Sequence, residues 1–207
     1  MTIASNKASS ESNPNDLKKD EFPSTAPAAY PVFFRSYSRK KPNGKRENWS
    51  EVGERNLSGL QKLGNLSKEE LTLMKEMQKN QKAQPSGRWL WIGGTPWIIK
   101  NENFSGAYNC TSTNLIDWEA FALMMDLAMM GCGTGAIIEP RFIEKLPIIR
   151  NKLNVKSISE VGITPKDKRV EKSTIEIKEN NIFIKVGDSR RGWVDSYKYL
   201  LEASSNK

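Results

Sequence analysis

Hydrophobic residues recur at helical spacing in three stretches of this chain. In the first, apolar residues from Leu71 to Met77 follow Ser67, and Glu70 stands three residues after that serine. A serine and a glutamate at this distance form a capping box, in which each side chain accepts a hydrogen bond from the other's backbone N–H. The pattern predicts a helix that begins after Ser67 and ends before Pro85, because proline is not tolerated in a helix interior.

The second stretch is almost entirely apolar. Asp117 is a good N-cap, and the run Trp118–Met130 after it contains only two charged residues, Glu119 and Asp126. These two acids are seven residues apart and therefore share one side of a helix. We expect a mostly buried helix with one narrow polar stripe, ended by Gly131.

Period-two alternation appears near the C-terminus. Ile175–Ile177 and Ile182–Val186 alternate on either side of Asn180-Asn181, which predicts a β-hairpin over 174–186. Apolar residues in Trp193–Leu201 then return to helical spacing and predict a last helix, the third helical stretch. The mixture of helices and strands indicates a mixed α/β fold class.

The N-terminal residues 1–28 have a different composition. They are rich in Ser, Asn, Pro, Asp and Lys, so they bury too little apolar surface to offset the entropy of ordering, and we expect a disordered tail. They also lack the apolar core of a secretion signal, and no apolar run reaches the ~20 residues of a bilayer span. We therefore expect a cytoplasmic protein with no membrane partner.

Composition excludes several chemistries. The 207 residues contain no histidine and two cysteines, which rules out Ser-His-Asp and Cys-His nucleophiles, histidine or Cys₄ zinc sites, and a disulfide framework. We expect no metal site. The formal net charge of +8 and the isoelectric point near 9.4 favour anionic partners such as nucleic acids, nucleotides or phosphates.

Two motifs offer chemistry from backbone groups or arginines. In Pro85–Thr95, a Ser-Gly-Arg turn, an aromatic strand and a Gly-Gly-Thr turn would present amides and a guanidinium to a phosphate, although a plain turn, buried strand and turn is the interpretation we favour. In Asp188–Trp193, Arg190 and Arg191 oppose the dipole at a helix start. They therefore bind an anion, pair with carboxylates elsewhere, or form a solvated basic surface.

The two cysteines lie in the remaining motifs. Cys110 has small polar neighbours that could stabilise a thiolate, but a free cysteine is more often a small buried hydrophobe. Cys132 lies in Gly131–Gly135, where alternating glycines let the backbone approach another group closely. We expect a glycine-rich turn between helix and strand there. Cys132 either fills space or pairs with Cys110.

Taken together and in this order, the motifs resemble the N-terminal part of the adenosylcobalamin-dependent (class II) ribonucleotide reductases, and most closely the monomeric ribonucleoside-triphosphate reductases. The resemblance runs from about Tyr30 to the C-terminus. The matching blocks are Phe34–Arg39, Glu47–Trp49, Pro85–Arg88, Leu90–Thr95, Asn109-Cys110, Gly131–Gly135 and Asp188–Val194.

The resemblance implies a fold and an activity. Such reductases convert ribonucleotides to deoxyribonucleotides at C2′ by thiyl-radical chemistry in a ten-stranded α/β barrel, with adenosylcobalamin as cofactor. By this resemblance, residues 29–84 form an N-terminal helical region and 85–207 the first part of the barrel. Residues 142–186, which include the hairpin, fall where the site for a deoxynucleotide specificity effector lies.

The resemblance also implies site residues. By its Asn-Cys context, Cys110 matches the first member of the family's redox-active cysteine pair. This role suits a cysteine, since a thiol near the substrate 2′-OH can give a proton and then an electron pair through a disulfide. Asn109 and the backbone around Gly133 would line the ribose pocket. Ser86 and Arg88 are weaker candidates for the substrate end of the site.

Two departures from the family pattern limit these expectations. Where Cys132 stands the family often has glycine, so Cys132 is expected to be accessory. The thiyl cysteine, the second redox cysteine, the catalytic glutamate and most of the cobalamin site should lie beyond Lys207. We therefore expect an incomplete, inactive front portion. Its partners would be the remaining C-terminal part of the reductase, a ribonucleotide substrate, a deoxynucleotide effector and a thioredoxin-type electron donor.

Two other classes of protein are alternatives. One is a basic nucleic-acid-binding module that uses Arg35–Arg46 with Tyr37 and Trp49, and its affinity would depend steeply on salt. It ranks lower because its basic residues are scattered and match no RRM, KH or helix-turn-helix pattern. The other is an inert and unstable gene remnant.

Overall fold

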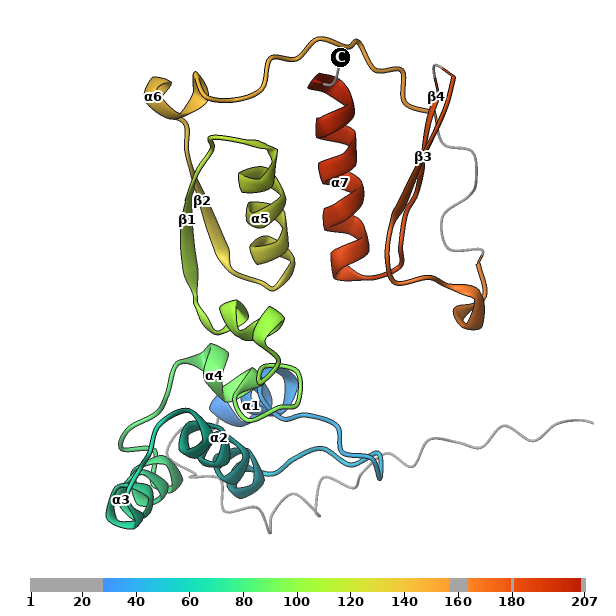
Figure 1. The fold of residues 1–207 in the computed structure, drawn as a ribbon. Coiled ribbons are helices and arrows are strands. Elements are labelled where there is room, and N and C mark those ends of the chain that lie inside the picture. The colour runs from blue at the N-terminus through green and yellow to red at the C-terminus, as the bar shows by residue number, and fades with distance from the viewer. Residues whose placement is uncertain (1–27, 157–163, 180, 206–207) are drawn as a thin grey trace, which may run out of the picture. The chain divides into compact units, whose positions relative to one another are not determined.

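The computed structural model in Figure 1 describes residues 28–156, 164–179 and 181–205. Nearly all of the expected disordered tail, residues 1–28, lies outside these described ranges. The chain divides into two compact units, Met1–Asn101 and Glu102–Lys207. Within the described ranges no helix is long and apolar enough to cross a membrane.

The first unit is helical. Its helices are α1 (Ala29–Ser36), α2 (Trp49–Leu63), α3 (Lys68–Lys79) and the short α4 (Gly87–Ile92). The predicted capping box of α3 is confirmed, since the backbone N–H of Glu70 donates to the Ser67 hydroxyl and that of Ser67 to the Glu70 carboxylate. The start of α2 has the same device in Asn48 and Glu51, a signal that the sequence analysis passed over.

The core of this unit is a small aromatic cluster. Phe33, Trp49, Val52 and Leu90 are buried together, and the Phe33 and Trp49 rings meet edge to face with centroids 5.4 Å apart. These residues come from α1, α2 and α4. Their burial therefore joins segments of the chain that lie more than fifty residues apart.

The expected strand within Pro85–Thr95 is wrong: the segment forms helix α4. A short apolar run does not distinguish a strand from a buried helix by its period. The local choice is made by the Ser86 hydroxyl, which accepts a hydrogen bond from the Trp89 N–H (3.2 Å) and caps the helix. Helix α4 packs on α2 and lies in the first compact unit, which runs to Asn101.

The second unit begins with a β–α–β arrangement. Strand β1 (Cys110–Asn114), helix α5 (Trp118–Met129) and strand β2 (Gly133–Ile137) follow one another, and the strands pair in parallel with Cys110 opposite Gly133. Parallel neighbours need a crossover, which α5 provides. Asp117 caps α5 as predicted, and Gly131, with φ of 85°, follows its C-terminus. The expected glycine-rich turn is therefore shorter, because Gly133 already lies in a strand.

The rest of the unit is a hairpin and a helix, as predicted. Strands β3 (Thr174–Lys178) and β4 (Asn181–Lys185) pair antiparallel, and α7 (Arg190–Ser205) follows. Short helices η2 (Asn101–Ala107), α6 (Pro140–Ile143) and η3 (Lys166–Lys168) connect the larger elements.

Helix α5 lies between the strand pair and α7 (Figure 1). The two helices run antiparallel, because Trp118 at the start of α5 donates to the Ser205 hydroxyl at the end of α7 (2.8 Å). The expectation of a mostly buried α5 is only partly met, since Leu123 and Met129 are 48% and 44% exposed. Its acidic stripe faces α7, where Glu119 pairs with Lys198.

Candidate functional site

Cys110 opens strand β1 on the uncovered face of the strand pair. Exposure alternates along the strand, with Cys110, Ser112 and Asn114 exposed and Thr111 and Thr113 partly buried. Since successive side chains point to opposite faces and α5 packs on one of them, the Cys110 thiol lies on the open face. The expectation of a small buried hydrophobe is therefore wrong for this cysteine.

Glycines lie across from the exposed side chains of β1. In the parallel register, Cys110 is opposite Gly133 and Ser112 is opposite Gly135. A Cβ atom at Gly133 would stand 3.5 Å from the Cys110 sulfur, and one at Gly135 would stand 3.9 Å from the Ser112 hydroxyl. These are ordinary contact distances, so a bulky side chain at either position would cover part of the thiol or the hydroxyl. The glycines thus leave a strip of thiol, hydroxyl and backbone accessible from one side.

Asn109 is hydrogen-bonded to the start of β2, beside Cys110. Its carbonyl accepts a hydrogen bond from the Gly133 N–H (2.8 Å), which ties the residue before Cys110 to the start of β2. The structure therefore brings together Cys110, Asn109 and Gly133, the three residues for which the family resemblance predicts a place around a ribose.

Cys132 lies in a different environment. It is 7% exposed, and its thiol donates to the carbonyls of Tyr108 (3.3 Å) and Ser105 (3.6 Å). Neither cysteine is in a disulfide. Of the two alternatives for Cys132, the structure shows the space-filling one, with its thiol bound to the segment that leads into Cys110.

Ser86 and Arg88 lie in the first unit, Ser86 as the N-cap of α4 and Arg88 within that helix. The Ser86 hydroxyl serves as the helix cap described above. The other end of α4 is held by Arg55, which donates to the carbonyls of Gly93 (2.5 Å) and Leu90 (3.1 Å) and forms an ion pair with Glu47 (2.8 Å). The motif Pro85–Thr95 thus has a structural role in this unit. No local signal in the sequence connects Arg55 to groups 35 or more residues away.

The two arginines at the start of α7 are paired with carboxylates. Arg190 contacts Asp126 of α5 at 2.5 Å, and its side chain is only 18% exposed. Arg191 contacts Asp126 at 3.4 Å and Asp195 at 3.1 Å. Of the three interpretations of this motif, pairing with acidic groups is the one that the structure shows. A solvated basic surface at Arg190 is wrong, because its side chain is only 18% exposed, whereas an anion site at Arg190 and Arg191 stays a prediction.

The remaining residues of this motif fix where α7 begins. The Ser189 hydroxyl donates to the Glu171 carbonyl (2.5 Å) and accepts from the Gly192 N–H (2.9 Å), as an N-cap does. A Cβ at Gly187 would stand 2.5 Å from the Glu171 oxygen, so only glycine allows this approach. The start of α7 is therefore locked to the chain just before β3.

The basic segment Arg35–Arg46 gives little support to the nucleic-acid alternative. Trp49 is 5% exposed, in the core, and cannot stack on a base. Arg46 donates to the Ser38 carbonyl (2.6 Å), and Lys41 pairs with Glu51 (2.6 Å). These groups serve the fold of the first unit.

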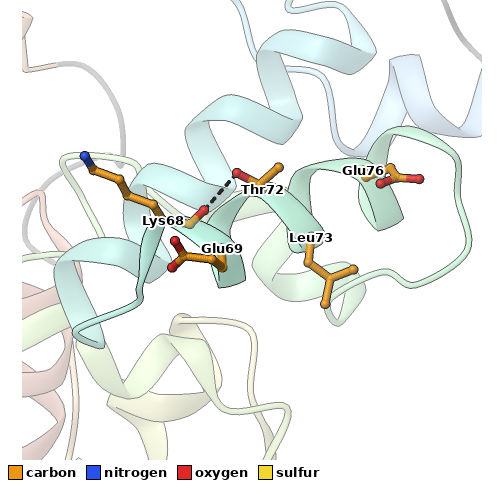
Figure 2. A pocket seen from close by; sticks show the side chains of 5 residues that line it. All are labelled: Lys68, Glu69, Thr72, Leu73 and Glu76. Carbon is orange, nitrogen blue, oxygen red and sulfur yellow. Dashed lines mark hydrogen bonds between the residues drawn. The ribbon is translucent and has the colours of Figure 1, made fainter.

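A hollow on the surface of α3 is shown in Figure 2. Its lining residues are Lys68, Glu69, Thr72, Leu73 and Glu76. The Thr72 hydroxyl donates to the Lys68 carbonyl within the helix (2.8 Å). All five residues come from one helix, and the three charged ones, one lysine and two glutamates, are of both signs, so no set of groups converges on a ligand there.

The fold of the chain is similar to that of part of a solved enzyme structure. A crystal structure of a B12-dependent (class II) ribonucleotide reductase matches 85% of the chain with a TM-score of 0.57 and 22% sequence identity, and the match covers 30% of that structure. This match, together with the observed helices and strands, confirms the mixed α/β class.

Curated relatives point in the same direction. A putative adenosylcobalamin-dependent ribonucleoside-triphosphate reductase of Mycobacterium phage D29 is 27% identical over 83% of the chain, and the match spans 25% of that protein. The adenosylcobalamin-dependent ribonucleoside-triphosphate reductase of Lactobacillus gasseri is 26% identical over 91% of the chain, and here the match spans 31%. A Euglena gracilis reductase of the same name is 27% identical.

These relatives confirm the resemblance that the motifs predicted. The chain spans only about a quarter to a third of the relatives' length. No protein-family model matches it.

Proposed function

We propose that this chain is a portion of an adenosylcobalamin-dependent ribonucleoside-triphosphate reductase, an oxidoreductase of deoxyribonucleotide synthesis, and that Cys110 is one of its redox-active cysteines. The observation that supports this most is the exposed Cys110 thiol on β1, directly opposite Gly133 on the uncovered face of a parallel strand pair. A thiol in this place is accessible to a substrate from one side and is held by a rigid element on the other.

The proposed reaction replaces the 2′-hydroxyl of a ribonucleotide by hydrogen. The hydroxyl leaves as water, and two cysteine thiols lose two electrons and two protons to become a disulfide, so atoms and charge balance. Cys110 supplies one thiol and a proton for the leaving hydroxyl. Asn109 and the backbone at Gly133 would hold the ribose, while Ser86 and Arg88 are secondary proposals for the substrate end.

The second thiol must come from outside the described site. Cys132 is buried, and its thiol is bound to the Ser105 and Tyr108 carbonyls. The sequence has two cysteines, whereas the proposed chemistry needs a thiyl cysteine and a redox pair. We therefore propose that this chain alone does not turn over. The remaining part of the reductase would supply the other cysteines and the catalytic glutamate, and a thioredoxin-type donor would reduce the disulfide again.

The pair of strands β1 and β2 has the features of an incomplete parallel sheet. Within the described ranges its sheet contains only β1 and β2, and its thiol-bearing face is open. A parallel sheet is normally covered on both faces. We propose that β1 and β2 are the first strands of a ten-stranded barrel, and that the region 142–186 with its hairpin belongs to a deoxynucleotide effector site.

Adenosylcobalamin is the proposed cofactor, and when bound it would supply the radical that starts the reaction. The residues beside Cys110 on β1 and β2 are small and polar, which suits a sugar better than the large corrin ring of a cobalamin. We assign the cofactor's contacts mostly to protein outside this chain.

Complementation tests the proposal. The chain is mixed with a polypeptide that carries the remaining part of a related reductase, together with adenosylcobalamin, a dithiol and a ribonucleoside triphosphate, and deoxyribonucleotide is quantified. We expect turnover with the wild-type chain and with Cys132→Ser, the matched control, but none with Cys110→Ser. Without the dithiol, one turnover should leave Cys110 in a disulfide that mass spectrometry detects.

Two outcomes would contradict the proposal. Turnover that survives in Cys110→Ser would remove the redox role of this residue. A wild-type chain that binds the complementing polypeptide but yields no deoxyribonucleotide would contradict the reductase assignment itself.

A further inference from the structure

The segment 102–109, which leads into Cys110, is held from two distant parts of the chain. At its start, Arg190 of α7 donates to the Asn103 side-chain oxygen (2.8 Å) and to the Glu102 carbonyl (3.2 Å). The same guanidinium forms the ion pair with Asp126 of α5. One side chain thus joins both helices to this segment.

Burial makes this junction strong. Asn103 is 5% exposed and Asp126 8% exposed, so both polar groups depend on their partners in the protein. A planar guanidinium presents several donors in a fixed fork and can serve three acceptors at once, which a lysine ammonium on a flexible stem does less well. Hydrogen bonds to charged groups are also worth more than neutral ones.

The end of the segment is held by the start of β2. The Cys132 thiol donates to the carbonyls of Ser105 and Tyr108, and the Gly133 N–H donates to the Asn109 carbonyl (2.8 Å). The segment 102–109 therefore covers Cys132, and it also leads directly into Cys110, whose backbone position depends on it. If the segment shifts, the position of one thiol and the accessibility of the other change together.

We propose that Arg190 is a positioning residue for Cys110: by binding Glu102 and Asn103, it fixes the segment 102–109 and so the place of the reactive thiol on the open face. The consequence for catalysis rests on the proposed function. The mechanical claim, that Arg190 holds the segment 102–109 in place, does not, because it concerns only contacts within the second unit.

Thiol labelling of the full-length chain tests the mechanical claim. In the wild type, a thiol reagent should modify the exposed Cys110 quickly and the buried Cys132 slowly, with each site quantified by peptide mass spectrometry. Arg190→Gln should raise the labelling rate of Cys132 by about tenfold to a hundredfold, because the segment opens more often without its charged hydrogen bonds. Arg191→Gln is the matched control and should label as the wild type does.

Local opening must be distinguished from loss of the fold. Hydrogen exchange of Arg190→Gln should rise in 102–109 and stay unchanged in β3 and β4. If this variant does not fold, Asn103→Ala removes the side-chain acceptor on the segment while Arg190 keeps its ion pair with Asp126, and it should raise Cys132 labelling in the same way. Unchanged Cys132 labelling in a folded Arg190→Gln or Asn103→Ala chain would overturn the proposal.

The complemented reductase gives the catalytic readout. We expect kcat of Arg190→Gln to fall by about tenfold or more while KM stays near the wild-type value, because a misplaced thiol slows the chemical step without weakening binding. Arg190→Lys, which can keep the ion pair with Asp126, should restore part of kcat. Equal kcat in wild type and Arg190→Gln would refute a positioning role. If no chain turns over, the reductase assignment fails, and labelling still decides the mechanical claim.

Discussion

Single residues decide how closely two backbones approach in the first unit. Gly94 has a φ of 71°, and a Cβ placed there would collide with the carbonyl oxygen of Arg55 on α2. On the other side, a Cβ at Gly59 would stand 2.6 Å from the Gly94 nitrogen. Two glycines thus allow α2 and the turn after α4 to touch, which in turn lets the Arg55 guanidinium reach the Gly93 carbonyl.

Substitution of Gly94 should therefore be costly. We expect Gly94→Ala to lower the free energy of unfolding by about 2–5 kcal/mol, from a left-handed backbone and a steric clash together. Gly44→Ala is the control, since Gly44 also has positive φ (80°) but no neighbour within 4 Å of its Cβ position. It should lose only about 1–2 kcal/mol. Urea unfolding of both variants measures the difference, and equal losses would contradict the role of the clash.

Elements in this protein begin where short-range hydrogen bonds cap them. Helix α2 starts at Asn48, whose N–H donates to the Glu51 carboxylate (2.8 Å), and the Lys41 ammonium donates to the same carboxylate (2.6 Å). Burial by itself raises the pKa of Glu51. The hydrogen bonds from Lys41 and Asn48 and the charge of Lys41 outweigh burial and lower the pKa below its ordinary value.

This lowered pKa makes the stability of the first unit pH-dependent. A carboxylate whose pKa is lower in the folded state stabilises the fold above its unfolded pKa, near 4.5, and this contribution is lost as the pH falls through the folded value. We expect Glu51→Gln to be less stable than wild type at neutral pH, by a margin that shrinks below pH 4.5.

The control for this prediction is Glu54→Gln. Glu54 lies one turn further along α2, is 61% exposed and meets Lys75 only at 3.9 Å. Its removal should change stability little at any pH, as is usual for exposed ion pairs. Urea unfolding from neutral to acid pH compares the two variants. A constant margin for Glu51→Gln across this range would show that its carboxylate does not carry the effect.

The helices and strands also show how far a local sequence pattern predicts structure. The capping residues Ser67 and Asp117 and the alternation over 174–186 predicted α3, α5 and the hairpin, because each depends on groups within a few residues of one another. Helix α4 was mistaken for a strand. Its apolar run is too short to show a period, and the groups that hold its end belong to Arg55, far away along the chain.

At the scale of the whole molecule, the chain consists of two compact units with separate buried residues. Val52 is 0% exposed in the first unit and Val194 is 1% exposed in the second. Because each unit has its own interior, damage to one core need not reach the other.

We expect the units to lose stability independently. Val52→Ala should destabilise the first unit by about 2 kcal/mol, and Val194→Ala should do the same in the second, from lost burial and the cavity left behind. Hydrogen exchange followed by peptide mass spectrometry reads the two units separately. If either substitution speeds the exchange of the most protected amides equally in both units, the chain unfolds as one cooperative block, contrary to this prediction.

The candidate site shows the same division between local and long-range information. The Asn109-Cys110 pair and the glycines after α5 were recognisable from their residues and their order along the chain. Their meeting was not, because Cys110 and Gly133 become neighbours only through the crossover of α5. Likewise, an arginine pair at a helix start predicts some negative partner, but only the antiparallel packing of α5 and α7 selects Asp126.

By itself, then, the sequence determined the capped starts of α3 and α5, the last helix and the hairpin. It also determined which chemistries histidine-free composition excludes, and which reductases the chain resembles. Tertiary structure alone decided that Cys110 is exposed and Cys132 is covered, and that Arg190 and Arg55 bind carbonyls and carboxylates distant in the chain. The reason is physical: caps and alternation depend on neighbours along the backbone, whereas burial and ion pairing depend on which surfaces pack together.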